Sequence, residues 1–426
     1  MAKKVLMVGW EYPPNITGGL GIACKGLVNS LAQKGISVHF MVPKLFGNEE
    51  CCENVELIDP SVIKTFLTQE EIQEIENLRA NVYSAEIRSS AYAYCGEESN
   101  WQSANKNTNA KDSLSEIQGG YTDRIFSEIS EYAAWAKAYA KKVDFDIVHA
   151  HDWMSFPAGK AASEAAKKPL VCHVHATEYD RSGDNVNERV FHLEKEALDS
   201  CDKAVTVSEY TKSILVNRYN ISADKIQAVH NGVDFENYDH LNSSNRGIDK
   251  DTKVVLFLGR ITFQKGPDYF VRAAQKVLEK TKNVRFVMAG TGDMYHRMIS
   301  FASGLGIGKY FHYTGFLNKD EVRRAYLTSD LYVMPSVSEP FGIAPLEAMN
   351  YRVPAIISKQ SGVSEILQNV IKIDFWDVDA LAENILHVTK YSGLSNDLKH
   401  NGYLEAKNVS WERSADKLLN LYHSLN

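Results

Sequence analysis

The sequence lacks long apolar runs and an excess of basic residues, and both absences exclude whole classes of protein. No apolar run approaches the length of about 20 residues that crosses a bilayer. The first apolar run is short and ends before Glu11-Tyr-Pro-Pro14, so we expect a first strand rather than a signal peptide. A net charge of -7 and a pI near 6.0 argue against nucleic acid as a partner.

Cysteine is scarce and carries no metal-type spacing in this chain of 426 residues. The six cysteines are Cys24, Cys51, Cys52, Cys95, Cys172 and Cys201. We expect reduced thiols in a cytoplasmic protein, although Cys51 and Cys52 are either a redox pair or ordinary loop thiols. Nucleotide signatures are also missing. There is no Walker-type Gly-x4-Gly-Lys-Ser/Thr, and Tyr295 stands where a dinucleotide-binding loop starting at Gly290 needs its third glycine.

Short apolar runs alternate with amphipathic stretches in both halves, which predicts parallel sheets covered by helices. We expect strands near 5–9, 37–42, 147–150, 170–175, 204–207 and 226–230, and again near 254–258, 284–288, 312–314, 331–334, 355–357 and 370–373. The prediction is therefore an α/β protein with two doubly wound domains, residues 1–236 and 250–409, joined by a polar linker at 237–253. Between 45 and 121 the alternation fails, so an inserted, partly mobile subdomain is expected.

The most informative stretch places Glu339 and Glu347 eight positions apart, across a loop that turns into a helix at 343–350. Such a helix directs the backbone N–H groups of Gly342, Ile343 and Ala344 at the sheet edge, where they bind phosphate. Glu347 is then placed to accept hydrogen bonds from ribose, and Glu339 from a sugar. The alternative is a surface loop with a capping glutamate.

Two other loops follow predicted strands at the edge where ligands bind in such folds. Gly18, Gly19 and Gly21 let the backbone pass close to an anion or a sugar, or form a plain turn. Arg260 and Lys265 follow the first strand of the second domain and together neutralise a diphosphate, unless they are ordinary solvated cations.

Histidines gather at the ends of two neighbouring strands, as His149, His151 and Asp152 on one and His173 and His175 on the next. A metal site from four histidines and Asp152 is conceivable, but we prefer pairing between rings and hydrogen bonding to substrate. Asn231-Gly-Val-Asp234 closes the first domain and has the composition of a turn.

In this order the motifs resemble the retaining glycosyltransferases of family 4, and within them the glycogen and starch synthase-like members. The elements that carry the resemblance are Thr-Gly-Gly-Leu-Gly, His-Ala-His-Asp-Trp, His-Ala-Thr-Glu-Tyr-Asp-Arg-Ser-Gly, Asn-Gly-Val-Asp, Gly-Arg-Ile-Thr-x-Gln-Lys-Gly and the Glu339/Glu347 pair. The resemblance runs from Glu11 to about Glu365 and is weakest at 45–121. It implies the GT-B fold, with two Rossmann-like domains facing a central cleft and a final helix near 410–426 returning to the first domain.

The resemblance also implies roles for matching residues. Arg260 and Lys265 bind the donor diphosphate, Glu339 the donor sugar and Glu347 the ribose. The catalytic group further includes His175 near the anomeric centre and Asp152 near the sugar or acceptor. The remaining donor-binding positions are Gly18, Gly19, Gly342, Ile343, Ala344 and Asn231. No metal and no cofactor are expected.

One departure separates the chain from the bacterial glycogen synthases of the related family 5. They carry a lysine two positions before the paired glycines, where this chain has Ile16, and they usually lack the second glutamate, which this chain keeps as Glu347. The expected function is transfer of glucose from ADP- or UDP-glucose onto an α-glucan. The alternatives are a family 4 enzyme building a cell-surface polysaccharide or glycolipid, a silent carbohydrate-binding or regulatory protein, and a pyridoxal-phosphate phosphorylase, whose chain is typically much longer.

Overall fold

A computed structural model describes residues 4–16, 18–86, 125–235 and 251–425, with the side chains of 78–86 excepted. The chain forms two compact units. Unit 1 comprises Met1–Tyr179, Gly183–Gly232 and Trp411–Asn426, and unit 2 comprises Asp180–Ser182 and Val233–Ser410. The expected linker at 237–253 falls mostly outside the described residues.

Unit 1 is built on a parallel sheet in the order β3-β2-β1-β4-β5-β6-β7. Its strands are β1 (Lys4–Val8), β2 (Ser37–Met41), β3 (Val55–Ile58), β4 (Ile147–His151), β5 (Leu170–Val174), β6 (Lys203–Thr206) and β7 (Ile226–Ala228). Strands β4 and β5 are buried along their whole length, as inner strands of a sheet covered on both faces should be.

Unit 2 repeats the architecture, in the order β10-β9-β8-β11-β12-β13. Its strands are β8 (Lys253–Leu258), β9 (Val284–Ala289), β10 (Phe311–Gly315), β11 (Leu331–Met334), β12 (Ala355–Ser358) and β13 (Ile371–Ile373). All strand pairs in this sheet are parallel. The two sheets confirm the predicted fold class of two doubly wound α/β domains.

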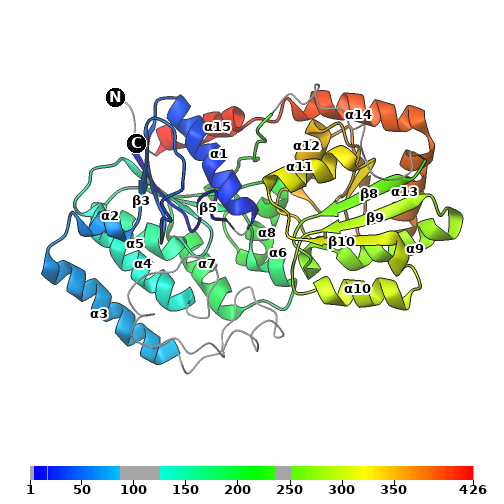
Figure 1. Ribbon diagram of the computed structural model, residues 1–426. Helices are drawn as coiled ribbons and strands as arrows, with labels where there is room; N and C mark the ends of the chain where they lie inside the picture. Colours follow the sequence, from blue (N-terminus) through cyan, green and yellow to red (C-terminus); the bar gives the residue numbers. More distant parts are fainter. Residues whose placement is uncertain (1–3, 17, 87–124, 236–250, 426) are drawn as a thin grey trace. The chain divides into compact units, whose positions relative to one another are not determined.

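Helices lie on both faces of each sheet (Figure 1). Those of unit 1 are α1 (Gly19–Gln33), α2 (Pro60–Lys64), α3 (Gln69–Glu86), α4 (Ile125–Ala140), α5 (Phe156–Ala166), α7 (Glu188–Ser200), α8 (Glu209–Tyr219) and α15 (Trp411–Ser424); α6 (Glu178–Ser182) falls at the division between the units. Those of unit 2 are α9 (Pro267–Lys280), α10 (Tyr295–Gly304), α11 (Lys319–Thr328), α12 (Ala344–Asn350), α13 (Val378–Lys390) and α14 (Ser392–Ala406). No helix in these ranges combines the length and the apolar character needed to cross a membrane.

The predicted strands are all present, but the structure corrects the expected insertion at 45–121. Strand β3 lies within that range and pairs in parallel with β2, with Val55 opposite Val38. Part of the supposed insertion is therefore the edge of the main sheet. Strand β3 was not predicted from the sequence. Its residues are only partly buried, so they do not form the clear apolar run by which a strand is recognised. Residues 87–124 lie outside the described part of the chain.

The final helix, α15, packs on α1 within unit 1, although hundreds of residues separate them along the chain. A Cβ on Gly26 would lie 2.3 Å from the ring of Trp411, so glycine at this position lets the indole pack against α1. Ser414 donates to the carbonyl of His230 at 2.6 Å, and Lys34 pairs with Asp416 at 2.6 Å. The C-terminal segment thus completes the covering of the first sheet.

Candidate active site

Both sheets reverse their strand order at a central position, and this is where doubly wound folds bind ligands. In unit 1 the reversal lies between β1 and β4, and in unit 2 between β8 and β11. The loops that leave these four strands carry four of the six sequence motifs, and the other two follow β5 and β7. Each unit therefore holds its share of the predicted site residues at one end of its sheet.

In unit 2, a glycine allows the loop after β8 to pack closely against the loop after β11. Gly266 has φ of +62°, and a Cβ there would lie 2.1 Å from the carbonyl oxygen of Pro335. The backbone of Val337 donates to the carbonyl of Gln264 at 2.9 Å, which joins the loops a second time. The cation-bearing loop and the carboxylate-bearing loop consequently form one platform.

The predicted charged residues meet on this platform. Lys265 Nζ lies 2.5 Å from Glu339 Oε2, and the hydroxyl of Ser336 donates to the same oxygen at 3.1 Å. Glu339 is only 6% exposed, so the lysine and the serine hold a largely buried carboxylate. Arg260 is exposed and donates to Gln264 at 3.3 Å. The two cations expected at the donor diphosphate thus share one loop, and Lys265 is already paired with the glutamate expected to hold the sugar.

The predicted phosphate-binding amides begin next to this ion pair. Gly342 has φ of +102°, and a Cβ there would meet Glu339 Cγ at 3.2 Å. The chain then enters α12, with a proline in its first turn as expected. The first N–H groups of a helix have no partner within it, so those at this end are open to an anion. Because α12 has only seven residues, we expect the charges of Arg260 and Lys265 to attract an anion more strongly than the N-terminus of this helix does.

Glu347 lies on α12 and is held by an aromatic hydroxyl that the sequence did not reveal. Tyr326 donates to Glu347 Oε2 at 3.0 Å and approaches the carbonyl of Ala344 at 3.2 Å. Burial raises the pKa of Glu347 above its ordinary value, although the hydroxyl of Tyr326 acts in the opposite direction. One carboxylate oxygen is fixed in this way, which orients the other as an acceptor.

In unit 1, the glycines after β1 divide into two kinds. A Cβ on Gly21 would lie 2.3 Å from Ile16 Cγ2, so Gly21 is needed for packing. Gly18 and Gly19, in contrast, would meet nothing within 4 Å. Gly18 is extended, with φ of -169°, so its backbone does not require glycine. The absence of a side chain at Gly18 and Gly19 is therefore not explained by unit 1 itself, which favours the close approach of a ligand.

The four histidines pair with one another, as the sequence analysis preferred. His149 Nε2 and His173 Nδ1 share a hydrogen bond of 3.1 Å, and His151 Nδ1 and His175 Nε2 share one of 3.0 Å. The rings also stack, with 4.3 Å between the centroids of His173 and His175. Burial lowers the pKa of His149 and of His175 to about 3, and the charge of His175 adds to the effect on His149. All four rings are neutral at physiological pH, because burial also holds the pKa of His151 and His173 well below the usual range.

Asp152 fixes the backbone beside His175. Its Oδ1 accepts from the backbone N–H of His175 at 2.6 Å and from that of Ala176 at 3.3 Å. The residue is buried and adopts φ of +61°, a conformation that aspartate tolerates better than most residues. The geometry gives Asp152 the task of holding His175, while its predicted contact with a sugar stays a prediction.

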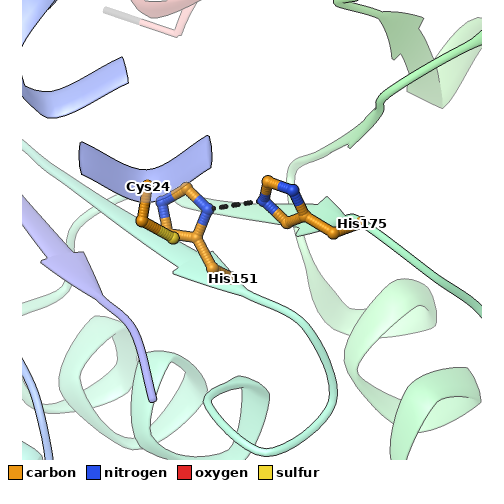
Figure 2. Close-up of side chains that lie close together, drawn as sticks. All are labelled: Cys24, His151 and His175. Atoms are coloured by element: carbon orange, nitrogen blue, oxygen red, sulfur yellow. Dashed lines mark hydrogen bonds between the residues drawn. The ribbon is translucent and has the colours of Figure 1, made fainter. Parts of the chain in front are cut away.

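Two groups in unit 1 have the composition of a metal site. Cys24, His151 and His175 form the first, and Figure 2 shows the thiol of Cys24 beside the paired rings. The second comprises His149, His151 and His173. However, the ring-to-ring hydrogen bonds occupy nitrogens of all four histidines, and burial raises the pKa of the Cys24 thiol, with Asp152 and Glu11 adding to it. Among the described residues, His151 Nε2 and His173 Nε2 keep no hydrogen-bond partner, so the expected absence of a metal stays a prediction.

Asn231 is placed differently from the turn that its neighbours suggested. Residues 229–235 form no turn, helix or strand. The side chain is 6% exposed, and its Oδ1 has no hydrogen-bond partner among the described residues. A buried amide oxygen without a partner is uncommon in proteins. This observation is compatible with the predicted donor-binding role, which stays a prediction.

Two family models together match most of the chain. Residues 119–237 match the family described as Glycosyltransferase Family 4, and residues 240–421 match the one described as Glycosyl transferases group 1. The chain is a glycosyltransferase of the family 4 type. An uncharacterized glycosyltransferase of Methanocaldococcus jannaschii is 27% identical over 448 residues, which span 98% of this glycosyltransferase and 97% of that relative.

Solved structures identify the fold as GT-B. Sucrose-phosphate synthase from Thermosynechococcus elongatus superposes with a TM-score of 0.73 at 17% identity, covering 99% of both chains. HepE of Anabaena, solved in complex with UDP and glucose, gives a TM-score of 0.67 at 14% identity, covering 99% of this glycosyltransferase and 100% of that chain. At such low identity the likeness concerns the fold alone.

Sequence reasoning missed the residues that hold the predicted site in place. Gln264 and Ser336 support Arg260 and Glu339, and Tyr326 supports Glu347. Gln264 lies inside the recognised Gly-Arg-Ile-Thr-x-Gln-Lys-Gly motif, so its position was a usable signal. Tyr326 lies in α11, 21 positions before its partner, and nothing in the local sequence marks it.

Proposed function

We propose that this glycosyltransferase transfers a hexosyl group, with retention of configuration, from a nucleotide sugar to a glycan acceptor. The observation that carries the proposal is the platform in unit 2 where Arg260, the Lys265–Glu339 pair and the amides at 342–344 follow the central strands. A diphosphate-linked sugar has the matching chemistry, because it presents an anion next to hydroxyl groups. The UDP and glucose bound by the Anabaena neighbour support this class of donor.

Each residue has a distinct proposed task. Arg260 and Lys265 bind the diphosphate and stabilise the negative charge that builds up on it as the bond to the sugar breaks. Glu339, held by Lys265 and Ser336, accepts hydrogen bonds from the sugar hydroxyls. Glu347, oriented by Tyr326, accepts from the ribose hydroxyls. In unit 1, His175 is proposed to contact the sugar near its anomeric carbon, and the backbone at Gly18 and Gly19 to approach the distal phosphate.

The proposed chemistry is attack by an acceptor hydroxyl on the face that the diphosphate leaves. The bond between the anomeric carbon and the diphosphate oxygen breaks, the new bond to the acceptor oxygen forms, and the hydroxyl proton passes to the departing phosphate. A double displacement would need a nucleophilic carboxylate on the other face. The carboxylate next to His175 is Asp152, and it accepts two backbone N–H groups, which makes it a poor nucleophile. No metal takes part in this scheme.

The acceptor that we propose is an α-glucan and the donor ADP- or UDP-glucose, as in the glycogen and starch synthase-like enzymes that the motifs resemble. This assignment rests on the His-Ala-His-Asp-Trp and His-Ala-Thr-Glu stretches of the sequence. A cytoplasmic location, expected from the unpaired cysteine pattern, belongs to the same proposal.

The test is a panel of nucleotide sugars incubated with the protein, with and without glycogen, in which released nucleoside diphosphate is measured. We expect release from ADP-glucose or UDP-glucose that rises when glycogen is added. Product examined by NMR should carry the same anomeric configuration as the donor. A parallel set of reactions replaces glycogen with a sugar phosphate or a lipid-linked glycan. Release that rises with one of these acceptors and not with glycogen would refute the glucan assignment, and inversion of the anomeric carbon would refute the mechanism.

A further inference from the structure

A continuous set of contacts runs from the final helix to His175, entirely within unit 1. The hydroxyl of Tyr422, on α15, is hydrogen-bonded to His149 Nδ1. The other nitrogen of His149 is bonded to His173 Nδ1 at 3.1 Å, and the ring of His173 stacks on that of His175 with 24° between their planes. Tyr422, His149 and His173 are all 0% exposed. A residue near the C-terminus thus acts on the neighbourhood of a proposed catalytic group.

Neutral histidines transmit the effect of one hydrogen bond to the next. A neutral imidazole carries one N–H and one bare nitrogen, so a bond that fixes one nitrogen as donor or acceptor fixes the other. A phenol O–H is a stronger acid than the N–H of a neutral imidazole, so the Tyr422 hydroxyl donates to His149 Nδ1. His149 then carries its proton on Nε2 and donates to His173 Nδ1, which fixes the tautomer of His173. The remaining nitrogen of His173, Nε2, has no hydrogen-bond partner in the described part of the chain. Its character, N–H or bare nitrogen, is determined by the tyrosine.

The hydroxyl of Tyr422 is not what attaches α15 to the rest of unit 1. Three other contacts do so: Trp411 on Gly26, Ser414 on the carbonyl of His230, and Asp416 with Lys34. A phenylalanine would fill the same buried volume as the tyrosine ring. Removing the hydroxyl therefore perturbs the histidine pairs and leaves the helix in place.

We propose that Tyr422 is a positioning residue, which sets the tautomer and the ring orientation of His149 and His173 and through them the orientation of His175 toward the sugar. This inference rests on the proposed role of His175. It assigns to the returning C-terminal helix a part in the transfer step, in addition to its part in packing.

The test compares Tyr422→Phe with a matched control, Tyr139→Phe. Tyr139 is a buried tyrosine of the same unit whose hydroxyl also bonds a histidine, His39 Nδ1, at 2.9 Å, but outside the histidine group described above. We expect Tyr422→Phe to lower kcat roughly tenfold, with the donor KM changed less than about twofold, because misplacing a reacting group affects the transition state more than substrate binding. Tyr139→Phe should keep both constants near wild type.

Nuclear magnetic resonance of protein labelled at histidine nitrogens supplies a readout that does not depend on activity. The signals of His149 and His173 should change tautomer or shift in Tyr422→Phe and stay unchanged in Tyr139→Phe. Equal kcat in the two variants, or unchanged signals of His149 and His173 in Tyr422→Phe, would overturn the inference.

A double variant separates this inference from the role of His175. In a His175→Ala background, Tyr422→Phe should cause no further loss of kcat, since the tyrosine acts through His175. The same loss in both backgrounds would refute the inference while leaving the proposed function standing. A wild-type rate in His175→Ala alone would refute the role of His175, and the inference with it.

Discussion

Lys265→Ala is the perturbation that tests the proposed function most directly, because it removes one cation and also unpairs a buried carboxylate. Lys265 Nζ lies 2.5 Å from Glu339 Oε2, and the side chains of these residues are 21% and 8% exposed. The substitution therefore affects both the charge offered to the diphosphate and the stability of unit 2.

The effect on stability follows from the burial of the pair. Removing one partner of a fully buried ion pair costs about 3–5 kcal/mol. Lys265 is partly exposed, and Ser336 continues to donate to Glu339 in the variant, so we expect about 1–3 kcal/mol. For a domain of this size that lowers Tm by roughly 3–10 °C. The variant should remain folded at 25 °C, which circular dichroism checks.

The effect on activity should be larger. Loss of one preorganised group that stabilises developing negative charge lowers kcat by about 10²–10³-fold, or about 3–4 kcal/mol. The assay is the release of nucleoside diphosphate under saturating donor, with Lys265→Arg expected to retain an intermediate rate. The matched control is Lys276→Ala, which breaks an exposed ion pair of 2.6 Å with Asp379 in the same unit. Turnover of Lys265→Ala within about threefold of Lys276→Ala would refute the reasoning, whatever the two variants do to Tm.

Four further outcomes are expected. Glu347→Ala should raise the donor KM more than it lowers kcat, and an effect confined to the acceptor KM would contradict the ribose assignment. Gly19→Ala should leave Tm unchanged or slightly raised but weaken donor binding. Gly21→Ala should lower Tm, because its Cβ would lie 2.3 Å from Ile16. An equal loss of Tm in both variants would contradict this distinction. Burial lowers the pKa of His149 and His175 from 6.5 to about 3, so the stability that their neutral forms contribute is complete above about pH 6.5 and is lost as the pH falls toward 3. Thermal unfolding between pH 4 and pH 7.5 checks this, and a constant Tm over that range would be inconsistent with it. Transfer should continue in EDTA; complete loss, restored by a divalent cation, would contradict the metal-free scheme.

The strands of both sheets were predictable because each is a short apolar run between amphipathic helices, a pattern that depends only on local sequence. Strand β3 was not predicted because its partly buried residues do not form such a run. The loops that carry Arg260, Lys265, Glu339 and the glycines were predictable as well, because they follow strands whose carboxyl ends must meet at one edge of a parallel sheet.

The sequence alone determined the alternation of strands and helices and the motifs at strand ends. The tertiary structure decided which of these groups touch. It paired Lys265 with Glu339, placed Tyr326 against Glu347 and brought Tyr422 to His149 across 273 positions of the chain. Those contacts join residues far apart in sequence, and they depend on how helices pack on a sheet rather than on any local propensity, so no pattern within a single segment could specify them.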